Sequence, residues 1–272
     1  SACLVGSEMC IRDRDTGAPV AYMSANILSA YRTGAVPGVG YKHLSKPDSK
    51  VAAIIGPGVM SKTALAAIMA VRPGIETIKV KGRGKASLEK FIAHVKKEYP
   101  QVNVYAVDTM EEAVRDADIV SASTSTPTGD PSQYPYIKEE WIKPGALISS
   151  TAALRFDDDF IIHRARTVTD NIKLYEAWEE EMKPNAYNTV PIPAVHVMDL
   201  IAEGRMKPEQ VDDLGDILMG NIPLHRKDDE IIVYSIGGMP VEDVAWGTMV
   251  YRNALKKGIG TKLKLWDVPQ MV

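Results

Sequence analysis

Short apolar runs alternate with amphipathic stretches along most of the chain. The apolar runs lie at residues 51–55, 77–80, 102–107, 117–122, 146–149 and 165–169. After the first run, Ala64, Leu65, Ile68 and Met69 have helical spacing, and residues 87–98 form a second amphipathic stretch. Strands that alternate with helices in this way predict a parallel sheet with right-handed crossovers. The expected fold class is therefore α/β, a Rossmann-type doubly wound parallel sheet.

The two ends of the chain predict further elements. Residues 24–46 have helical spacing, but Pro37 and Gly38 are expected to interrupt that helix. Residues 211–219 predict a helix, residues 230–235 a strand, and residues 244–256 a helix that Gly258 ends. Residues 1–14 show no clear period, and we expect them to be a non-native leader; the alternative is an ordinary disordered leader.

A glycine turn follows the first strand of the predicted sheet. Gly56 makes the turn, Gly58 permits close approach of a ligand to the backbone, and Ser61 is small enough for close packing of helix on strand. A helix that begins there directs unpaired N–H groups at one point, which suits a pyrophosphate. An ordinary strand-to-helix turn is the alternative. The surrounding strand–turn–helix pattern favours dinucleotide binding.

The second predicted strand ends in a basic segment. Lys81, Arg83 and Lys85 occupy the tip, where an acidic residue would bind the ribose hydroxyls of NAD. Arg83 would instead attract a 2′-phosphate, so we expect a preference for NADP, with NAD as a possible cofactor. A solvated basic turn is the competing explanation.

Composition narrows the function classes. The chain has 272 residues, 45% of them hydrophobic, and a net charge of -3, which gives no electrostatic case for nucleic acid. No apolar run is long enough to span a membrane. Cys3 and Cys10 both lie near the start, which favours a reducing, cytoplasmic setting. The scattered histidines predict no metal site.

Several motifs together resemble one family, the ornithine cyclodeaminase and mu-crystallin family. They are, in chain order, Asp-Thr-Gly at 15–17, Arg-Thr-Gly-Ala at 32–35, Gly-Pro-Gly at 56–58, Ala-Asp-Ile-Val at 117–120, Asp-Asp-Glu-Ile at 228–231 and Gly-Met-Pro-Val-Glu-Asp at 238–243. The resemblance implies a homodimer that uses NAD or NADP to move hydride at the α-carbon of a small amino or imino acid. It also implies a substrate and dimerisation domain from residues 15–45 and 235–272, with a Rossmann domain at 46–234 between them.

Site residues follow from the same resemblance. Arg32 is expected to hold the substrate carboxylate, since a guanidinium pairs with it through two hydrogen bonds. A surface arginine is the alternative. The expected cofactor-binding residues, besides Arg83, are Thr33, Gly56, Gly58, Val59, Met60, Ser123 and Thr124.

Two departures from the family pattern affect the expected activity. Leu154 occupies the position of the family's catalytic aspartate, and Asp157 is the nearest replacement, although it could equally be an exposed helix cap. The family's substrate-binding Lys and Glu precede the Asp-Thr-Gly motif, where this chain has only residues 1–14. A non-catalytic protein that binds NADP and a small ligand, like mu-crystallin, is therefore the alternative to an ornithine cyclodeaminase, alanine dehydrogenase or ketimine reductase.

Overall fold

A computed structural model describes residues 8–126, 128–224 and 227–266. The chain divides into two compact units. The larger unit is Thr33–Gly238, and the smaller one combines Ser1–Arg32 with Met239–Val272. No helix in the described ranges is long and apolar enough to cross a bilayer.

An eight-stranded parallel sheet forms the centre of the larger unit. Its strand order is β5-β4-β3-β6-β7-β10-β8-β9. The strands are β3 (Val51–Ile55), β4 (Thr77–Lys81), β5 (Asn103–Ala106), β6 (Ile119–Ala122), β7 (Leu147–Ser150), β8 (Ala165–Thr169), β9 (Val211–Asp213) and β10 (Ile231–Ser235). The sheet and its neighbouring helices confirm the predicted Rossmann-type fold class.

Alternate side chains of each strand enter two different cores. In β3, Ala52 and Ile54 pack on one face of the sheet, whereas Ala53 and Ile55 pack on the other. Both sets are almost completely buried, which explains why central strands of a parallel sheet are apolar throughout. The two cores hold helices against both faces of the sheet.

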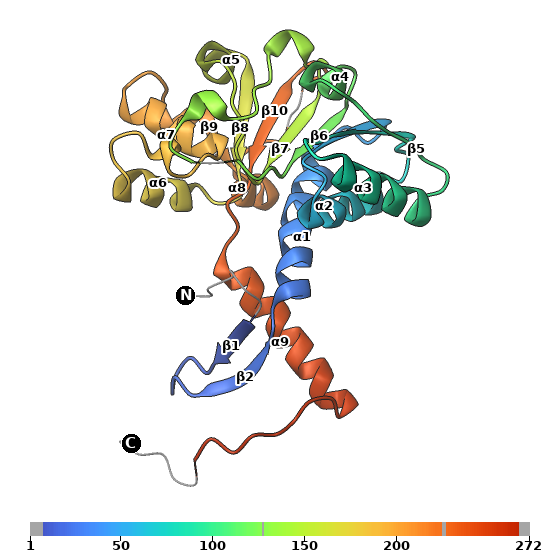
Figure 1. Cartoon of the computed structure of the whole chain (residues 1–272). Coiled ribbons are helices and arrows are strands. Elements are labelled where there is room, and N and C mark those ends of the chain that lie inside the picture. The colour runs from blue at the N-terminus through green and yellow to red at the C-terminus, as the bar shows by residue number, and fades with distance from the viewer. Residues whose placement is uncertain (1–7, 127, 225–226, 267–272) are drawn as a thin grey trace. The chain divides into compact units, whose positions relative to one another are not determined.

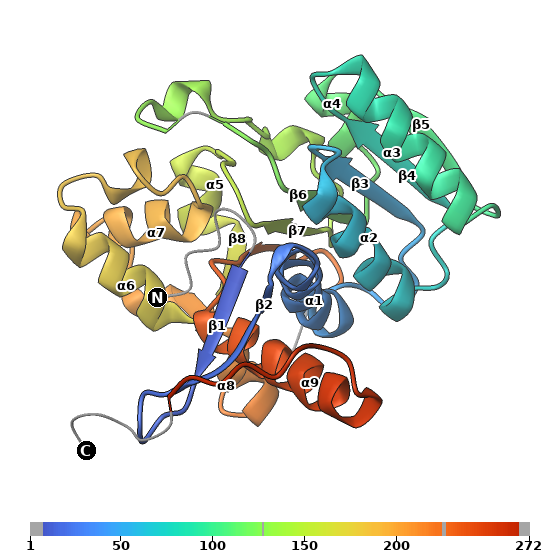
Figure 2. The same ribbon diagram turned by 60° about the horizontal axis from the view of Figure 1, so that its bottom comes forward.

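The helices divide between these cores by their buried residues. One core contains residues of α1 (Asn26–Leu44), α2 (Val59–Val71), α3 (Lys85–Glu98) and α8 (Leu214–Met219). The other contains residues of α4 (Met110–Val114), α5 (Asp158–His163), α6 (Ile172–Glu181) and α7 (Pro193–Ala202). In Figure 2, α2 and α3 lie beside β3 and β4, and α6 and α7 lie at the other end of the sheet. Short 3-10 helices occur at Pro131–Gln133, Glu139–Trp141, Ala186–Asn188 and Pro208–Gln210.

Helix α1 continues through Pro37, contrary to the expected interruption. Proline inside a helix costs about 3 kcal/mol, so another contribution must offset it. A Cβ at Gly38 would lie 2.9 Å from the Cβ of Ala67 in α2, and one at Gly40 would clash with the ring of Tyr234. These glycines allow α1 to pack closely in the core, and this packing keeps the helix regular.

The helix predicted at 211–219 is wrong in its first part. Residues Val211–Asp213 form β9, which pairs with β8 at the edge of the sheet, and only Leu214–Met219 is helical. The Asp213 side chain accepts a hydrogen bond from the N–H of Gly215 and caps α8. The cap ends the strand and begins the helix, which the apolar spacing alone did not separate.

The smaller unit contains a hairpin and a long helix. Strand β1 (Glu8–Arg12) pairs antiparallel with β2 (Pro19–Ser24), and Figure 1 shows both with α9 (Pro240–Lys257). Met9 and Ile11 are buried, and a Cβ at Gly247 of α9 would lie 2.8 Å from the sulfur of Met9. Part of the segment expected to be a non-native leader therefore has an alternating buried face in the structure.

Candidate dinucleotide site and a second cavity

The strand order reverses direction beside β3. The chain runs from β3 through β4 to β5 on one side, and then returns to place β6 on the other side of β3. Ligands of open α/β sheets bind at such a switch point, outside the carboxyl ends of the strands. Here those ends lead to Gly56 and Ser123, and the N–H of Ser123 donates to the carbonyl of Ile55 at 2.9 Å. The fold thus brings the glycine turn together with the exit of β6.

Gly56 and Gly58 have different roles in the turn. Gly56 has a φ of 89°, and a Cβ at this position would clash with the carbonyl oxygen of Ser123. Gly58 has open space where its Cβ would be. Gly56 is therefore required by the turn itself, whereas Gly58 leaves its backbone accessible from outside. Ser61 is fully buried, and its hydroxyl donates to the carbonyl of Gly56.

Helix α2 begins at the turn with an open amino end. Gly58 is its N-cap residue, and no side chain among the described residues caps it. Val59 and Met60 in its first turn are 63% and 38% exposed. The first N–H groups of a helix have no partner within the helix, so this end presents donors to an anion. Backbone, space and dipole all fit a pyrophosphate here.

Thr33 lies on the part of α1 that packs against the beginning of α2. A Cβ at the next residue, Gly34, would clash with Thr63 in α2. The larger unit therefore gathers Thr33 and the glycine turn in one region. Thr33 and the glycine turn are more than twenty residues apart in the chain, so the sequence alone did not indicate that they are close in space.

Hydroxyl groups line the exits of β6 and β7. The Oγ of Ser123 lies 2.8 Å from the Oγ1 of Thr151, and the Thr124 hydroxyl donates to the carbonyl of Ala153 at 3.1 Å. Thr151 was not among the predicted site residues. Its position just after a predicted strand could have identified it as a site residue, because ligands bind at the carboxyl ends of parallel strands.

Arg83 follows β4 at the same edge of the sheet. Its guanidinium donates to the carbonyl of Ser125 in the segment after β6. A Cβ at Gly82 would lie 2.6 Å from the ring of Pro57, so the residues before Arg83 pack directly on the glycine turn. The basic tip and the turn are therefore neighbours.

Arg32 belongs to the smaller unit, where it pairs with acidic residues of α9. Its Nε donates to Asp243 at 2.9 Å, and its Nη1 lies 3.6 Å from Glu242. The Asp243 side chain is completely buried. The guanidinium is consequently held by two carboxylates, and its orientation is fixed by the helix that carries them.

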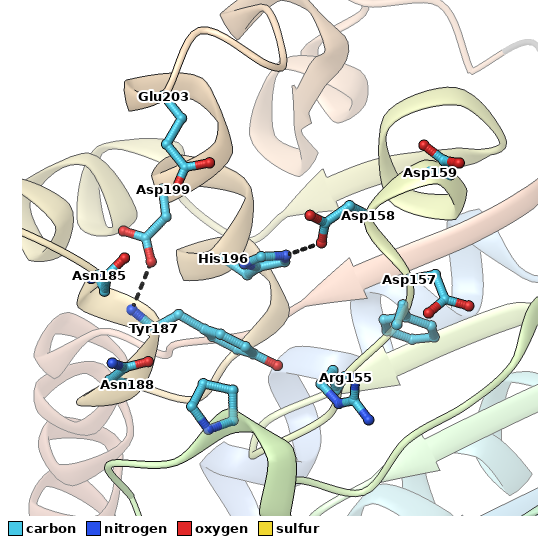
Figure 3. A pocket seen from close by; sticks show the side chains of 12 residues that line it. Arg155, Asp157, Asp158, Asp159, Asn185, Tyr187, Asn188, His196, Asp199 and Glu203 are labelled. Carbon is cyan, nitrogen blue, oxygen red and sulfur yellow. Dashed lines mark hydrogen bonds and ion pairs between the residues drawn. The ribbon is translucent and has the colours of Figure 1, made fainter.

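Asp157 is not among the residues gathered at the glycine turn. It precedes α5, and its carboxylate accepts a hydrogen bond from the Tyr136 hydroxyl at 2.6 Å, which raises the pKa of that tyrosine. Leu154 is fully buried in the core, and its carbonyl accepts a hydrogen bond from the Tyr187 hydroxyl at 2.7 Å. Asp157 lines a separate cavity, shown in Figure 3.

The cavity has a volume of about 590 Å³. Its wall comes from the segment before α5, from the 3-10 helix at Ala186–Asn188 and from α7. The residues that line it are Pro131, Arg155, Phe156, Asp157, Asp158, Asp159, Asn185, Tyr187, Asn188, His196, Asp199 and Glu203. None of them belongs to the glycine turn or to the exit of β6. Only Asp157 was singled out from the sequence, because the other residues come from segments that share no motif.

Most acidic groups of the cavity already have partners. Asp158 accepts from His196 at 2.8 Å and pairs with Arg205 at 2.6 Å. Burial raises the pKa of Asp158, but these two partners outweigh burial and leave it below its usual value. Asp199 accepts from the N–H groups of Ala186 and Tyr187, both at 3.0 Å. Across the described ranges, no group of three or more His, Cys, Asp or Glu could hold a metal ion.

Comparisons with known proteins agree with this fold. An N-((2S)-2-amino-2-carboxyethyl)-L-glutamate dehydrogenase from Staphylococcus aureus is 28% identical over 257 residues, 94% of this chain and 70% of that protein. An alanine dehydrogenase from Archaeoglobus fulgidus is 26% identical and spans 96% of this chain and 74% of its own length. The Δ1-pyrroline-2-carboxylate reductase structure from Thermococcus litoralis, in complex with NADH and L-proline, has a TM-score of 0.77 at 26% identity and covers 94% of this chain and 74% of its own.

A family model extends this agreement along the chain. The model of the ornithine cyclodeaminase/mu-crystallin family matches residues 5–258. That range includes the glycine turn, the hydroxyl-lined strand exits and the pair formed by Arg32 and Asp243. By sequence and by fold, the chain belongs to the ornithine cyclodeaminase/mu-crystallin family.

Proposed function

We propose that this protein is an NAD(P)-dependent oxidoreductase that transfers hydride at the α-carbon of a small amino or imino acid. The observation that carries the proposal is the open amino end of α2, next to an accessible Gly58 at the switch point of the sheet. The named relatives add chemical support, because they are dehydrogenases and reductases of amino and imino acids. Cyclodeaminase chemistry belongs to the same class of reaction at the α-carbon.

The glycine turn would hold the pyrophosphate of the dinucleotide. The N–H of Gly58 donates to the carbonyl of Gly56 at 2.8 Å, so the backbone N–H groups of Val59 and Met60 would donate to the pyrophosphate oxygens beside the exposed Gly58, with Thr33 as an additional donor. Ser123 and Thr124 would face the nicotinamide ribose from the exit of β6. When bound, the nicotinamide supplies or accepts the hydride.

Arg32 would bind the substrate carboxylate. Its contacts with Glu242 and Asp243 involve Nε and Nη1, and a guanidinium carries five N–H donors in a planar fork. The two acids would restrain the side chain, so that little rotamer freedom is lost when a carboxylate binds.

The choice between NAD and NADP is a finer part of the proposal. The Thermococcus litoralis reductase was solved with NADH and an archaeal alanine dehydrogenase with NAD. In this chain, the basic tip at Arg83 packs beside the turn and carries no acidic residue. We therefore propose that NADP is preferred and that NAD also binds.

A second copy of the chain would cover the apolar surface of the smaller unit. Ile27 is 74% exposed, and α9 exposes Val241 at 61%, Met249 at 60% and Leu255 at 62%. Several exposed large apolar side chains on one helix indicate an interaction surface. The archaeal alanine dehydrogenase, 25% identical with a TM-score of 0.77 over 95% of this chain and 74% of its own, is described as a dimer. Light scattering after size exclusion should give twice the mass of one chain.

Turnover is the direct test of the proposed function. NADPH and NADH oxidation should be followed with pyruvate plus ammonia and with cyclic ketimines, and proline formation should be followed with ornithine. Oxidation of NADPH or NADH with pyruvate plus ammonia, or with a cyclic ketimine, supports a dehydrogenase or reductase. Formation of proline from ornithine supports a cyclodeaminase.

The buried Leu154 stands at the position of the family's catalytic aspartate, and it favours a non-catalytic binding protein as the alternative. A protein that binds the dinucleotide and a small ligand without turnover would give no reaction with any of these substrates. Cofactor binding should persist in that case, and it can be measured by the change in NADPH fluorescence.

A further inference from the structure

The carboxylate of Asp170 holds the backbone of a neighbouring strand exit. Asp170 immediately follows β8, and its Oδ2 accepts from the N–H groups of Gly237 at 3.0 Å and Gly238 at 2.8 Å, just after β10. Its Oδ1 accepts from the Tyr175 hydroxyl at 2.7 Å and from the N–H of Asn171 at 3.0 Å. Hydrogen bonds to an ionised carboxylate are short and strong. Asp170 therefore fixes the chain at Gly237 and Gly238.

The segment that Asp170 holds is closely packed but partly accessible. A Cβ at Gly237 would lie 2.6 Å from the side chain of Leu174 and 3.0 Å from that of Trp178, both in α6. A larger residue would not fit there without a shift of the helix. Gly237 and Gly238 are nevertheless partly exposed. Their backbone is consequently fixed by Asp170 and α6, while part of its surface can meet a ligand.

Hydrogen bonds connect this segment to the proposed cofactor site. The N–H of Ile236 donates to the carbonyl of Ser150 at 2.9 Å. Ser150 precedes Thr151, whose hydroxyl lies 2.8 Å from that of Ser123. The exit of β10 is thus held by the end of β7 on one side and by Asp170 on the other. One bonded row of strand exits runs from Ser123 to Asp170.

The strand order indicates which half of a dinucleotide would reach this row. A pyrophosphate at the amino end of α2 would have β4 and β5 on one side and β6, β7 and β10 on the other. Arg83, which follows β4, is the proposed partner of the 2′-phosphate, so the adenosine half would occupy that side. The nicotinamide half would therefore extend over the exits of β6, β7 and β10.

We propose that Asp170 is a positioning residue for the nicotinamide. It fixes Gly237 and Gly238, which form the surface beside the ring, and it does not touch the cofactor itself. The inference rests on the proposed function and gives Asp170 no part in binding the pyrophosphate or the adenosine. Hydride transfer requires the ring to be held in one orientation, so a loosened exit affects the nicotinamide half alone.

The test compares two ligands that differ in the nicotinamide ring. NADPH contains the ring, and ADP-ribose 2′-phosphate lacks it. Calorimetric titrations of the full chain should show NADPH binding at least about tenfold more tightly. Asp170→Asn, which replaces two charged acceptor oxygens by one neutral oxygen, should weaken NADPH binding at least about fivefold and change binding of ADP-ribose 2′-phosphate by less than about twofold. Equal losses for both ligands, or no loss for either, overturn the proposal.

Control variants separate positioning from general stability. Tyr175→Phe removes a donor to Oδ1 but leaves both glycine contacts on Oδ2, so it should lower stability and change NADPH affinity by less than about twofold. Asp48→Asn, an exposed change before β3, should alter neither quantity. A loss of NADPH affinity in Tyr175→Phe as large as in Asp170→Asn would assign Asp170 a structural role only.

A measurement on the unchanged chain needs no variant. In spectra of ¹⁵N-glycine-labelled protein, NADPH should shift the amide signals of Gly237 and Gly238, whereas ADP-ribose 2′-phosphate should leave them in place. The same two amides should exchange hydrogen at least about tenfold faster in Asp170→Asn than in Tyr175→Phe. Equal affinity of the unchanged chain for the two ligands overturns this inference alone. If neither ligand binds, the proposed function fails, and the inference fails with it.

Discussion

The guanidinium of Arg32 donates through Nε to Asp243, a carboxylate that is completely buried, at 2.9 Å. The two residues are 211 positions apart in the chain, and both belong to the smaller unit. Arg32 therefore has a structural partner in addition to its proposed ligand. The pair allows the structural and the binding contributions of Arg32 to be separated.

Arg32→Gln should lower the free energy of unfolding by about 3–5 kcal/mol, because it leaves Asp243 buried without compensation. The double variant Arg32→Gln/Asp243→Asn should be destabilised by less than the sum of the two single variants. Urea unfolding measures all three. Arg252→Gln, an exposed change on α9, is the matched control and should be neutral. Additive effects would show that the two side chains are not coupled.

Gly58→Ala should separate cofactor binding from stability. Open space surrounds this position, so the free energy of unfolding should change by less than about 1 kcal/mol. NADPH affinity should fall at least about tenfold, because the methyl group would occupy the space proposed for the pyrophosphate. Fluorescence titration measures that affinity, and urea unfolding measures the stability.

Gly56→Ala should behave differently. Its φ of 89° and the carbonyl of Ser123 both oppose a side chain, so the free energy of unfolding should fall by more than about 1 kcal/mol. Unchanged NADPH affinity in Gly58→Ala would argue against the glycine turn as the cofactor site, whatever Gly56→Ala does.

Arg83→Ala should weaken NADPH binding by about 10- to 100-fold, the loss expected for a charged hydrogen bond to phosphate. NADH affinity should change by less than about threefold, because NADH has no 2′-phosphate for Arg83 to contact. Lys90→Ala, an exposed change on α3, controls for general electrostatics. Equal losses for the two cofactors would contradict the proposed preference for NADP.

Asp118 should make the free energy of unfolding depend on pH in the acidic range. Burial raises its pKa, but hydrogen bonds from Lys143 and from the N–H groups of Lys50 and Val51 bring it below the usual 3.8. The folded state therefore binds its proton less readily than the unfolded state. The stabilisation is complete above about pH 5 and is lost as the pH falls below about 4.

Asp118→Asn should remove part of this acid dependence and lower the free energy of unfolding at pH 7 by about 1–2 kcal/mol. Urea unfolding between pH 2.5 and 7 measures both effects. Asp116→Asn is the matched control, because its left-handed backbone is one that Asn also adopts. If the free energy of unfolding of Asp118→Asn and of the unchanged chain varied with pH in parallel, Asp118 would not be a source of the acid dependence.

The sequence predicted the elements that depend on short-range pattern. Apolar runs identified every strand of the sheet except β9, and the central strands β3, β6 and β7 are largely apolar because they are buried on both faces. The spacing of Thr109 and Glu112 is typical of a capping box, and in the structure this box begins α4 with both of its hydrogen bonds present. Gly258 predicted the end of α9, and it adopts a left-handed conformation with φ of 64°. Each of these features is settled within a few residues.

Long-range packing determined what the sequence left open. Pro37 remains helical because Gly38 and Gly40 pack on residues distant in the chain. Val211 belongs to a strand because it pairs with β8 at the edge of the sheet. The cavity of Arg155 and His196 is formed by segments with no shared motif. The sequence by itself determined the fold class and the glycine turn, since both follow from local periodicity. Only the tertiary structure decided the partners of Arg32 and Asp170, because charged side chains find their partners in space and not along the chain.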